Sequence, residues 1–496
     1  WSAGESGVKN TEIPSSGLEF SGRELRSFGR QVTDELIRYL EGLDEGLAAP
    51  ENLEVDAVRK AVREPLPRTA QGLDQAWKDV LSRVLPHSVR VGHPRFLAWI
   101  RTSPLGGAVF SESLAAALNQ SVAVWDGAPA AAEIEKLVID WLIELSGYHP
   151  EAGGLLTSGG SMANFTGLAA ARSRLDPGVR RHGLAGRPPQ TVYLTSQSHY
   201  SLVKAVEMLG LGREWTRNVP VDDRLRMDPE ALRKVIRQDR SRGFRPLAAA
   251  ATLGTTGTGT CDPLNALAEV CSEEGVWLHV DGAYGGLAGL VPGKKDLTAG
   301  LERADSFVLD PHKNLFMPFE AGCLLVRDPR SLLDAFAVET DYLPNTRREG
   351  EDRSYEAHHY RDYGPQLSRS FRALKIYLSL KAYGVEAVAG ETAREYALAA
   401  RLGELIDQAE DFRRLAEVNL GVVAFQFLPA EGISDQELNR SHTRLVEILQ
   451  RRGRVYLSRV SVRGRVGFRA CFVSHRTGEK DLPVILEEIR TASREL

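Results

Sequence analysis

The chain has 496 residues, of which 43% are hydrophobic and 26% charged, and its formal net charge is −4. This is the composition of a globular protein of about two or three domains. The near-neutral charge and the lack of a basic tract argue against nucleic-acid binding. No apolar run approaches the roughly 20 residues that a membrane helix needs, so no membrane association is predicted.

The first residues and the cysteines bear on location. Residues 1–20 are polar and rich in Gly and Ser, so we expect them to be disordered, and they contain no apolar core of a secretion signal. The first residue is Trp1 rather than Met, which indicates a trimmed start and leaves a removed signal open. The four cysteines lack CxxC spacing and are too few for a disulfide scaffold. We therefore expect a cytoplasmic protein.

Residues 1–104 are predicted to form a helical arm. Apolar residues recur there at the spacing of an amphipathic helix, at Leu25, Phe28, Val32, Leu36 and Leu40. A second helical run covers Trp77–Leu85, after a turn rich in proline. The arm has too few apolar residues for a core of its own, so we expect it to pack on another surface, such as that of a second subunit.

Residues 105–385 alternate between strand and helix patterns and are predicted to form one large α/β domain. The expected strands are short apolar runs at Thr191–Thr195, Leu247–Leu253, Val276–Val280, Ser306–Leu309 and Gly322–Val326. Amphipathic helices are expected between them at Ser198–Leu209, Pro229–Gln238 and Pro263–Glu273. This pattern indicates a mainly parallel sheet covered on both faces, whose ligands bind beyond the carboxyl ends of the strands.

A long helix at about Leu367–Ala382 ends this domain. Residues 386–496 are predicted to form a small C-terminal α+β domain with strands at Val422–Leu428 and Val466–Phe472. The chain contains no internal repeat.

The stretch 155–174, LLTSGGSMANFTGLAAARSR, combines a strand-like start, a glycine turn and a helix. Gly160 lets the backbone approach an anion closely, and Ser161 adds a hydroxyl donor beside the free amides of the helix N-terminus. These features favour a bound phosphate. The alternative is an ordinary helix with a serine near its N-cap and glycines in the preceding turn.

Two further polar segments follow predicted strands. In LGTTGTGTCDP (253–263), Thr255 and Thr256 can bond a phosphate or a ring substituent, although a polar loop that needs glycine flexibility explains the same residues. In SQSHYSLVKA (196–205), His199 opens a helix. It can cap that helix, belong to the core, or stack on an aromatic ligand.

Two strand ends carry the strongest signal. Asp281 ends the strand in VWLHVDGAYGG (276–286), and Lys313 follows the strand in DSFVLDPHKN (305–314). Taken alone, the aspartate can be a helix cap and the lysine a surface residue. Together with the glycine turn they form the set that pyridoxal phosphate requires: a lysine for the Schiff base, a carboxylate for the pyridinium nitrogen and a phosphate cradle. Lys294 and Lys295 lie in a Pro-Gly loop instead.

These segments, in this order and spacing, resemble the pyridoxal-phosphate-dependent group II amino-acid decarboxylases, the family of the aromatic-L-amino-acid and glutamate decarboxylases. The resemblance runs from about Glu24 to Arg490 and includes HPRFLAW (93–99), HYRDYGPQLSRSFRALK (359–375) and RACFVSHRT (469–477). It implies the aspartate-aminotransferase-like fold (PLP fold type I) and an intertwined homodimer. It also implies decarboxylation of an L-amino acid with pyridoxal 5'-phosphate as cofactor.

The resemblance implies a role for each candidate residue. Lys313 forms the Schiff base, Asp281 pairs with the ring nitrogen, and His199 stacks on one face of the ring. Further cofactor contacts come from Ala283 on the opposite face and from Gly160, Ser161, Thr256 and His312.

A mobile loop of the family carries a tyrosine that protonates the substrate carbon after carbon dioxide leaves. Counting back from LSRSFRALK, this tyrosine aligns with Tyr360. The polar segment 346–364, TRREGEDRSYEAHHYRDYG, has the composition of a flexible loop. The structural alternative for Tyr360 is an anchor that fixes the loop to the core.

The substrate is predicted from the wall formed by Trp99, Ile100, Arg101 and Thr102, where aromatic decarboxylases commonly read Tyr-Phe-Pro-Thr. Trp99 and Ile100 can pack against an aromatic ring, whose burial is worth roughly 2–3 kcal/mol. Arg101 can pair with a carboxylate, but an exposed ion pair contributes only about 0–1 kcal/mol. We therefore expect tryptophan, tyrosine or phenylalanine as substrate. A glutamate, aspartate or diaminobutyrate decarboxylase is the alternative.

Other activities fit the residues less well. In this family an aromatic aldehyde synthase lacks the loop tyrosine or has Asn in place of the stacking histidine, and both residues are present here. A metal hydrolase would use two strand-end pairs, His279 with Asp281 and Asp310 with His312, but it leaves Lys313 without a role. A non-catalytic binding protein is not favoured, because no core site residue is missing.

Overall fold

The structure is a computed structural model that describes residues 18–50, 53–338, 358–429 and 433–496. The chain divides into two compact units, one formed by Trp1–Glu45 and Asn52–Ser88 and the other by Gly46–Glu51 and Val89–Leu496. Within the described ranges, no helix combines the length and apolar character needed to cross a membrane. The expected disorder of residues 1–20 concerns mainly 1–17, which lie outside the described residues.

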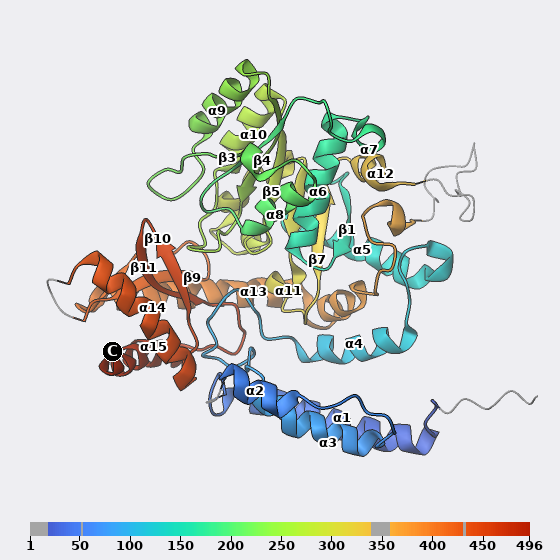
Figure 1. The fold of residues 1–496 in the computed structure, drawn as a ribbon, viewed down its shortest axis with the longest axis vertical. Helices are drawn as coiled ribbons and strands as arrows, with labels where there is room; N and C mark the ends of the chain where they lie inside the picture. The colour runs from blue at the N-terminus through green and yellow to red at the C-terminus, as the bar shows by residue number, and fades with distance from the viewer. Residues whose placement is uncertain (1–17, 51–52, 339–357, 430–432) are drawn as a thin grey trace, which may run out of the picture. The chain divides into compact units, whose positions relative to one another are not determined.

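The described part of the first unit contains three amphipathic helices, α1 (Gly22–Glu41), α2 (Val55–Val62) and α3 (Leu73–Arg83) (Figure 1). A capping box begins α1, because the Ser21 hydroxyl accepts from the Glu24 amide while the Glu24 carboxylate accepts from the Ser21 amide. Phe28 of α1 meets Trp77 of α3 edge to face, with ring centroids 5.9 Å apart. None of these helices contains a buried residue, as expected for a segment with so few apolar residues.

A seven-stranded sheet forms the centre of the second unit, in the order β1-β7-β6-β5-β4-β2-β3. Its strands are β1 (Gly153–Thr157), β2 (Gln190–Leu194), β3 (Thr216–Asn218), β4 (Arg245–Thr252), β5 (Trp277–Asp281), β6 (Ser306–Leu309) and β7 (Gly322–Val326). Neighbouring strands from β3 to β6 are parallel, whereas β7 is antiparallel to both β6 and β1. The predicted mainly parallel α/β sheet and its five expected strands are confirmed. The reversal of β7 and the short strand β3 have no counterpart in the sequence prediction.

Helices cover both faces of this sheet (Figure 1). The helices of this part of the chain are α4 (Gly106–Leu118), α5 (Pro129–Ser146), α6 (Gly160–Leu175), α7 (Val179–His182), α8 (Tyr200–Met208), α9 (Pro229–Ser241), α10 (Leu264–Glu274), α11 (Pro311–Asn314) and α12 (Arg330–Phe336). In β4, Ala248 and Ala250 pack with α6 and α8, whereas Ala249 and Ala251 pack with α9 and α10. Because successive side chains of a strand point to opposite faces, a strand covered on both faces is apolar throughout.

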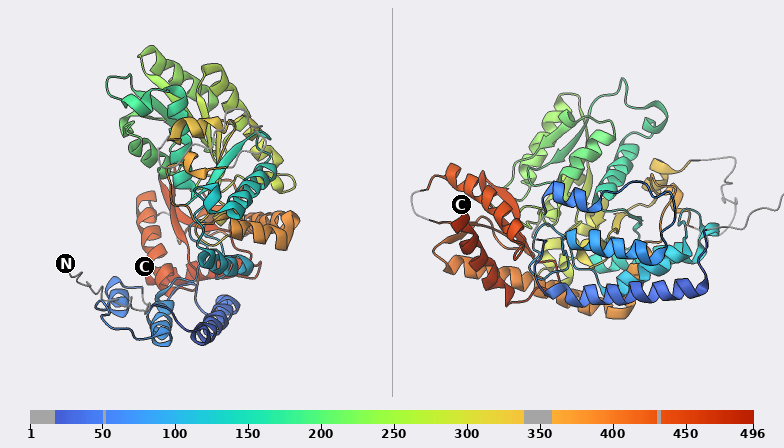
Figure 2. Two further views of the ribbon diagram at one scale, coloured as in Figure 1. Left: turned by 90° about the vertical axis from the view of Figure 1, so that its right-hand side faces the viewer. Right: turned by 60° about the horizontal axis from the view of Figure 1, so that its bottom comes forward.

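The chain leaves the large sheet through α13 (Ala373–Gln408), which is interrupted at Gly384, where φ is 77°. Beyond it lies an antiparallel sheet in the order β10-β11-β9-β8, formed by β8 (Phe412–Arg414), β9 (Val422–Phe427), β10 (Ser458–Val462) and β11 (Arg465–Cys471). The helices α14 (Asp435–Arg452) and α15 (Asp481–Ala492) pack with this sheet, in orange and red beside the central sheet in Figure 2. The small C-terminal α+β fold is therefore confirmed, with β8 and β10 added to the two expected strands. The domain boundaries at residues 104 and 385 stay a prediction.

A fully buried ion pair joins Glu135 of α5 to Arg369. Both side chains also bond to the backbone of β1, the strand that precedes the glycine turn. The side chains of Glu135 and Arg369 are 0% and 1% exposed. The Glu135 carboxylate accepts from the Leu156 amide at 3.0 Å, and Arg369 donates to the Leu156 and Val122 carbonyls at 2.8 and 2.9 Å. Because loss of either partner would leave a buried charge uncompensated, α5 and β1 depend on each other for their positions.

Candidate active site

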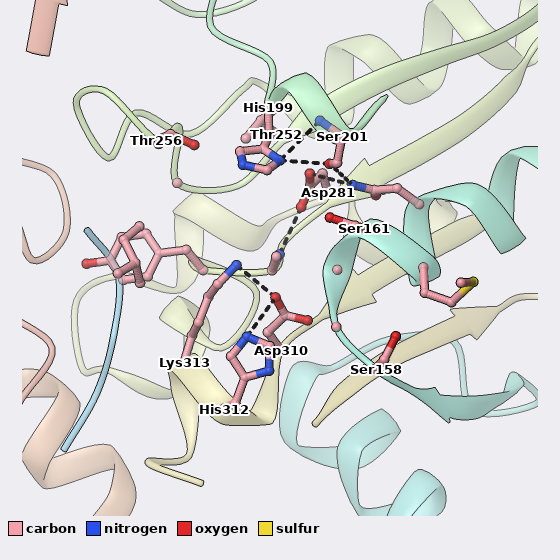
Figure 3. A pocket seen from close by; sticks show the side chains of 18 residues that line it. Ser158, Ser161, His199, Ser201, Thr252, Thr256, Asp281, Asp310, His312 and Lys313 are labelled. Atoms are coloured by element: carbon pink, nitrogen blue, oxygen red, sulfur yellow. Dashed lines mark hydrogen bonds and ion pairs between the residues drawn. The ribbon is translucent and has the colours of Figure 1, made fainter. Parts of the chain in front are cut away.

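The carboxyl ends of the parallel strands open into one pocket, whose wall collects residues that are far apart in the sequence (Figure 3). This is where an α/β sheet is expected to bind its ligand. The predicted site residues that line the pocket are Ile100, Gly160, Ser161, His199, Thr256, Asp281, Ala283, His312 and Lys313.

Lys313 lies in α11, directly after β6. Its side-chain nitrogen Nζ is 2.7 Å from Oδ2 of Asp310 (Figure 3). Burial lowers the pKa of Lys313, but the carboxylates of Asp310 and Asp281 raise it, and the result is a pKa above the ordinary value. The amine is therefore held protonated beside a carboxylate, and it must lose that proton before it can act as a nucleophile.

Asp281 is the last residue of β5, and its side chain is buried. Its Oδ2 accepts from Nδ2 of Asn164 at 3.0 Å, and its Oδ1 accepts from the Ala283 amide at 3.1 Å. These two donors hold both carboxylate oxygens in place. A buried carboxylate of this kind can keep a proton on a ring nitrogen that lies beside it.

The glycine turn between β1 and α6 is closely packed against the pocket wall. Gly159 has a φ of +139°, a conformation that side chains rarely adopt. A Cβ atom on Gly160 would lie 3.0 Å from Oδ2 of Asp310 and 3.2 Å from Cβ of Ala283. Glycine therefore lets α6 begin at the wall itself, where the free amides of its first turn and the Ser161 hydroxyl are the donors that a phosphate needs.

His199 is the N-cap of α8 and also lines the pocket. Its Nδ1 accepts from the Ser201 amide at 3.3 Å and lies 2.7 Å from the Ser201 hydroxyl (Figure 3). Burial lowers the pKa of His199 below its ordinary value, although the Asp281 carboxylate raises it. The ring is therefore neutral near pH 7 and suited to lie against an aromatic ligand.

His312 and Thr256 complete the wall. The Nε2 atom of His312 is 3.5 Å from Oδ2 of Asp310, its Nδ1 accepts from a backbone amide at 3.3 Å, and burial lowers its pKa. Thr102 lies behind this histidine, because its hydroxyl donates to the His312 carbonyl at 3.1 Å. Thr256 lies on the loop after β4, and its carbonyl accepts from Arg469 of β11.

The predicted substrate wall is divided. Ile100 lines the pocket, whereas Trp99 and Arg101 do not. Trp99 is 40% exposed and packs against Phe96 and Tyr456, with ring centroids 6.1 and 5.9 Å away. The guanidinium of Arg101 lies 4.9 Å from the centroid of the Trp99 ring. In this chain Arg101 therefore makes a cation–π contact rather than lining the pocket.

Tyr360 is not among the residues that line the pocket. It lies in a short 3-10 turn, Tyr360–Asp362, with its side chain 1% exposed and the Arg369 guanidinium 4.7 Å from its ring centroid. Burial raises its pKa well above the ordinary value, and the Glu135 carboxylate adds to this effect. Its role as proton donor stays a prediction. Of the predicted loop 346–364, residues 346–357 lie outside the described residues.

Sequence reasoning missed Asn164 and Ser201 of the pocket wall, and it considered Asp310 only as a possible metal ligand. Asp310 follows β6 directly, so its strand-end position was the same signal that identified Asp281. Asn164 lies three positions after Ser161 on α6, a spacing that places two helical residues on the same side. These residues therefore had local signals, but only the fold shows which groups they contact.

His279, which the sequence offered as a metal ligand, bonds to other side chains. Its Nδ1 is 2.7 Å from the Ser306 hydroxyl, and its Nε2 is 2.8 Å from Oδ1 of Asn164. Among the residues that the structure describes, no group of three or more His, Cys, Asp and Glu is placed to hold a metal ion.

Comparison with known proteins gives the class. A model of the pyridoxal-dependent decarboxylase conserved domain matches residues 57–428. The aromatic-L-amino-acid decarboxylase of Bacillus atrophaeus is 32% identical over 97% of this chain and 98% of its own length. An acidic amino acid decarboxylase of Mus musculus is 31% identical over 86% of this chain and 78% of its own length. The chain belongs to the pyridoxal-dependent decarboxylase family, and it is a pyridoxal-phosphate-dependent amino-acid decarboxylase.

Solved structures agree with this assignment. Oryza sativa TDC with PLP and tryptamine matches with a TM-score of 0.90 at 26% identity, covering 97% of this chain and 99% of that chain. Mouse CSAD matches with a TM-score of 0.86 at 27% identity, covering 96% and 99%. The fold is thus PLP fold type I. The pocket fits the cofactor, because it offers an amine to the aldehyde, an acceptor carboxylate to the ring nitrogen and helix-start amides to the phosphate.

Proposed function

We propose that this chain converts an aromatic L-amino acid (tryptophan, tyrosine or phenylalanine) to its amine and carbon dioxide, with Lys313 as the residue that binds pyridoxal phosphate. The observation that carries the proposal is the convergence of the Lys313 amine, the Asp281 carboxylate and the start of α6 on one pocket. No other lysine of the described chain lines that pocket.

Each residue has a task in this proposal. Bound pyridoxal phosphate supplies the electron sink, because its protonated ring accepts the electron pair of the bond that breaks. Asp281 keeps the proton on the ring nitrogen, and His199 and Ala283 hold the ring between them. The remaining contacts, at the phosphate and near the Lys313 nitrogen, come from Gly160, Ser161, Thr256 and His312.

The aromatic substrate is supported by the composition of the predicted substrate wall. Ile100 offers an apolar surface, and burial of an aromatic side chain is worth roughly 2–3 kcal/mol. Arg101 lies over Trp99 and is exposed, so its pairing with a substrate carboxylate would contribute about 0–1 kcal/mol. The relatives are named for both aromatic and acidic substrates, so glutamate, aspartate or diaminobutyrate is the alternative.

Aromatic aldehyde formation is a further alternative, because a phenylacetaldehyde synthase of Petunia hybrida is 30% identical to this chain. In the family that this chain resembles, aldehyde formation goes with replacement of the stacking histidine, and His199 is present here. We therefore propose the amine as the product.

The cofactor role of Lys313 is tested by borohydride reduction of the purified enzyme. We expect a yellow protein and covalent label on the peptide that contains Lys313, with loss of both colour and label in Lys313→Ala. Lys294→Ala is the matched control, because Lys294 lies outside the pocket and bonds the Asn419 carbonyl. Label on another lysine of the parent enzyme would refute the assignment.

The substrate is tested by kcat/KM for tryptophan, tyrosine, phenylalanine, glutamate and aspartate, in the parent and in Arg101→Ala. We expect an aromatic amino acid to be the best substrate of both enzymes. If glutamate or aspartate is best and Arg101→Ala abolishes its turnover, the aromatic assignment is wrong.

We also propose a cytoplasmic homodimer in which the helical arm, residues 1–104, packs on the partner subunit. The helices α1, α2 and α3 contain no buried residue, so their apolar stripes are available for another surface. The four cysteines are buried and free, which is in keeping with a reducing compartment. Sedimentation equilibrium should give twice the mass of the chain, and the mass of a single chain would contradict the dimer.

A further inference from the structure

Asn164, in the second turn of α6, joins two residues of the proposed cofactor site. Its Nδ2 donates to Oδ2 of Asp281 at 3.0 Å and to the Ser201 hydroxyl at 2.9 Å. The Ser201 hydroxyl is in turn 2.7 Å from Nδ1 of His199 (Figure 3). On the other side, Oδ1 of Asn164 is 2.8 Å from Nε2 of His279. The amide is thus bonded at both ends, at a position only 1% exposed.

Burial determines the direction of each of these bonds, because buried polar groups must be paired. The ionised Asp281 carboxylate only accepts, so Asn164 turns its NH2 group towards it and its oxygen towards His279, which must carry a proton on Nε2. Nδ1 of His279 then accepts from the Ser306 hydroxyl, and that hydroxyl accepts from Nε1 of Trp277 at 2.7 Å. Every donor in this chain of bonds points towards the carboxylate.

The same bonds determine the tautomer of His199. The Ser201 hydroxyl accepts from Asn164, so its own proton is directed at Nδ1 of His199. The Ser201 backbone amide also donates to Nδ1, at 3.3 Å. With two donors directed at Nδ1, the neutral ring carries its proton on Nε2. His199 is then an N–H donor for an acceptor in the pocket, such as the carboxylate of a substrate.

We propose that Asn164 is a positioning residue that holds the Asp281 carboxylate in place and, through Ser201, keeps His199 in its Nε2–H form. This inference rests on the proposed cofactor roles of Asp281 and His199. One buried amide would thus control both the group at the ring nitrogen and the group on the ring face. Asp281 is bonded to Asn164 directly, and His199 is bonded to Ser201, which Asn164 holds. A change at either group would therefore change a hydrogen bond of Asn164 or of Ser201.

The test compares the parent with Asn164→Ala and Asn164→Asp. Loss of one hydrogen bond to a charged group should raise the Kd of the cofactor-free protein for pyridoxal phosphate by roughly 10- to 100-fold in Asn164→Ala. The Kd of Asn164→Asp should rise further, because this variant brings a second carboxylate to within hydrogen-bond distance of Asp281. The pH titration of the visible absorption band of the bound cofactor should shift in both variants, because both change the electrostatic surroundings of the ring nitrogen.

Asn439→Ala is the matched control, because Asn439 also bonds two groups, the Gly464 carbonyl and the Val466 amide, far from the pocket. A purely structural role of Asn164 would lower Tm without moving the pH titration of the band. Equal Kd values and superimposable titrations for the parent and Asn164→Asp would overturn the inference.

Two further measurements make the outcome specific. Nitrogen-15 NMR of the histidine-labelled, cofactor-free parent should show His199 as the Nε2–H tautomer. The signals of His199 are identified by their absence from the spectrum of His199→Gln. An Nδ1–H tautomer would overturn the inference and leave the proposed function unaffected. Asp281→Ala should lose tight cofactor binding. Binding like that of the parent would overturn the cofactor role of Asp281 and, with it, this inference.

Discussion

Replacement of Asp310 by Asn tests whether this carboxylate holds the proton on Lys313. The two charged atoms are 2.7 Å apart, and Asn keeps the shape of the side chain while removing its charge. An opposite charge in contact shifts a pKa by about 1–3 units, or about 1.4–4 kcal/mol. We expect the pKa of Lys313 to fall by this amount, because the burial that lowers it is then less opposed. The unprotonated fraction of the amine near neutral pH should rise roughly 10- to 1,000-fold.

The assay is the rate at which cofactor-free enzyme captures pyridoxal phosphate, followed by absorbance as a function of pH. Only the unprotonated amine attacks the aldehyde, so the profile of Asp310→Asn should be displaced to lower pH. Asp305→Asn is a matched control, because Asp305 lies next to the other end of β6 and pairs with Arg327. Coincident profiles for the parent and Asp310→Asn would refute the reasoning.

The ion pair between Lys313 and Asp310 also makes the stability of the folded protein depend on pH. The pKa of Lys313 is raised on folding, so the folded protein binds this proton more tightly than the unfolded chain. The stabilisation is fully present below the unfolded value of about 10.5 and is lost as the pH rises through the raised folded value. Asp310→Asn should therefore lower Tm at neutral pH, and the difference in Tm between the variant and the parent should become smaller in strong alkali.

Three further predictions concern stability and product. Glu135→Gln leaves buried Arg369 without its counter-charge and should cost about 3–5 kcal/mol in urea unfolding; a cost no larger than that of the exposed Glu133→Gln would contradict this. Burial lowers the pKa of His93 to about 4, so the unfolded chain binds the extra proton and Tm should fall as the pH drops from about 6.5 to about 4; an unchanged Tm would speak against it. Tyr360→Phe should keep cofactor binding but divert the product from the amine towards aldehyde and ammonia, and an unchanged amine yield would remove Tyr360 from the mechanism.

Local sequence patterns sufficed for much of the fold and for the pocket. Apolar runs located β2, β4, β5, β6 and β7, because strands covered on both faces are continuously apolar. Asp281 and Lys313 followed from one geometric rule, since residues after parallel strands meet at one edge of a sheet. That rule depends only on the direction of the chain.

Other features depend on contacts between distant segments. A strand has the same apolar pattern whether it runs parallel or antiparallel to its neighbours. The antiparallel direction of β7 therefore could not be predicted from its sequence. Tyr360 lies in a polar segment, yet Arg369 and Glu135 make its site a buried one. Asn164 resembles any polar residue in the first turns of a helix until the fold brings Asp281 and His279 to its two ends.

The reversal of β7 makes the lysine-bearing segment a closed hairpin. Antiparallel neighbours need no crossover helix, so residues 310–321 turn back across the sheet edge, and pairing of Leu309 with Cys323 clamps the base of the turn. A Cβ on Gly322 would lie 2.4 Å from Cα of Gly159, so the end of the hairpin packs directly against the glycine turn. The amine is therefore preorganised: most of the entropy of ordering it is lost when the chain folds, and little remains to be lost when a ligand arrives.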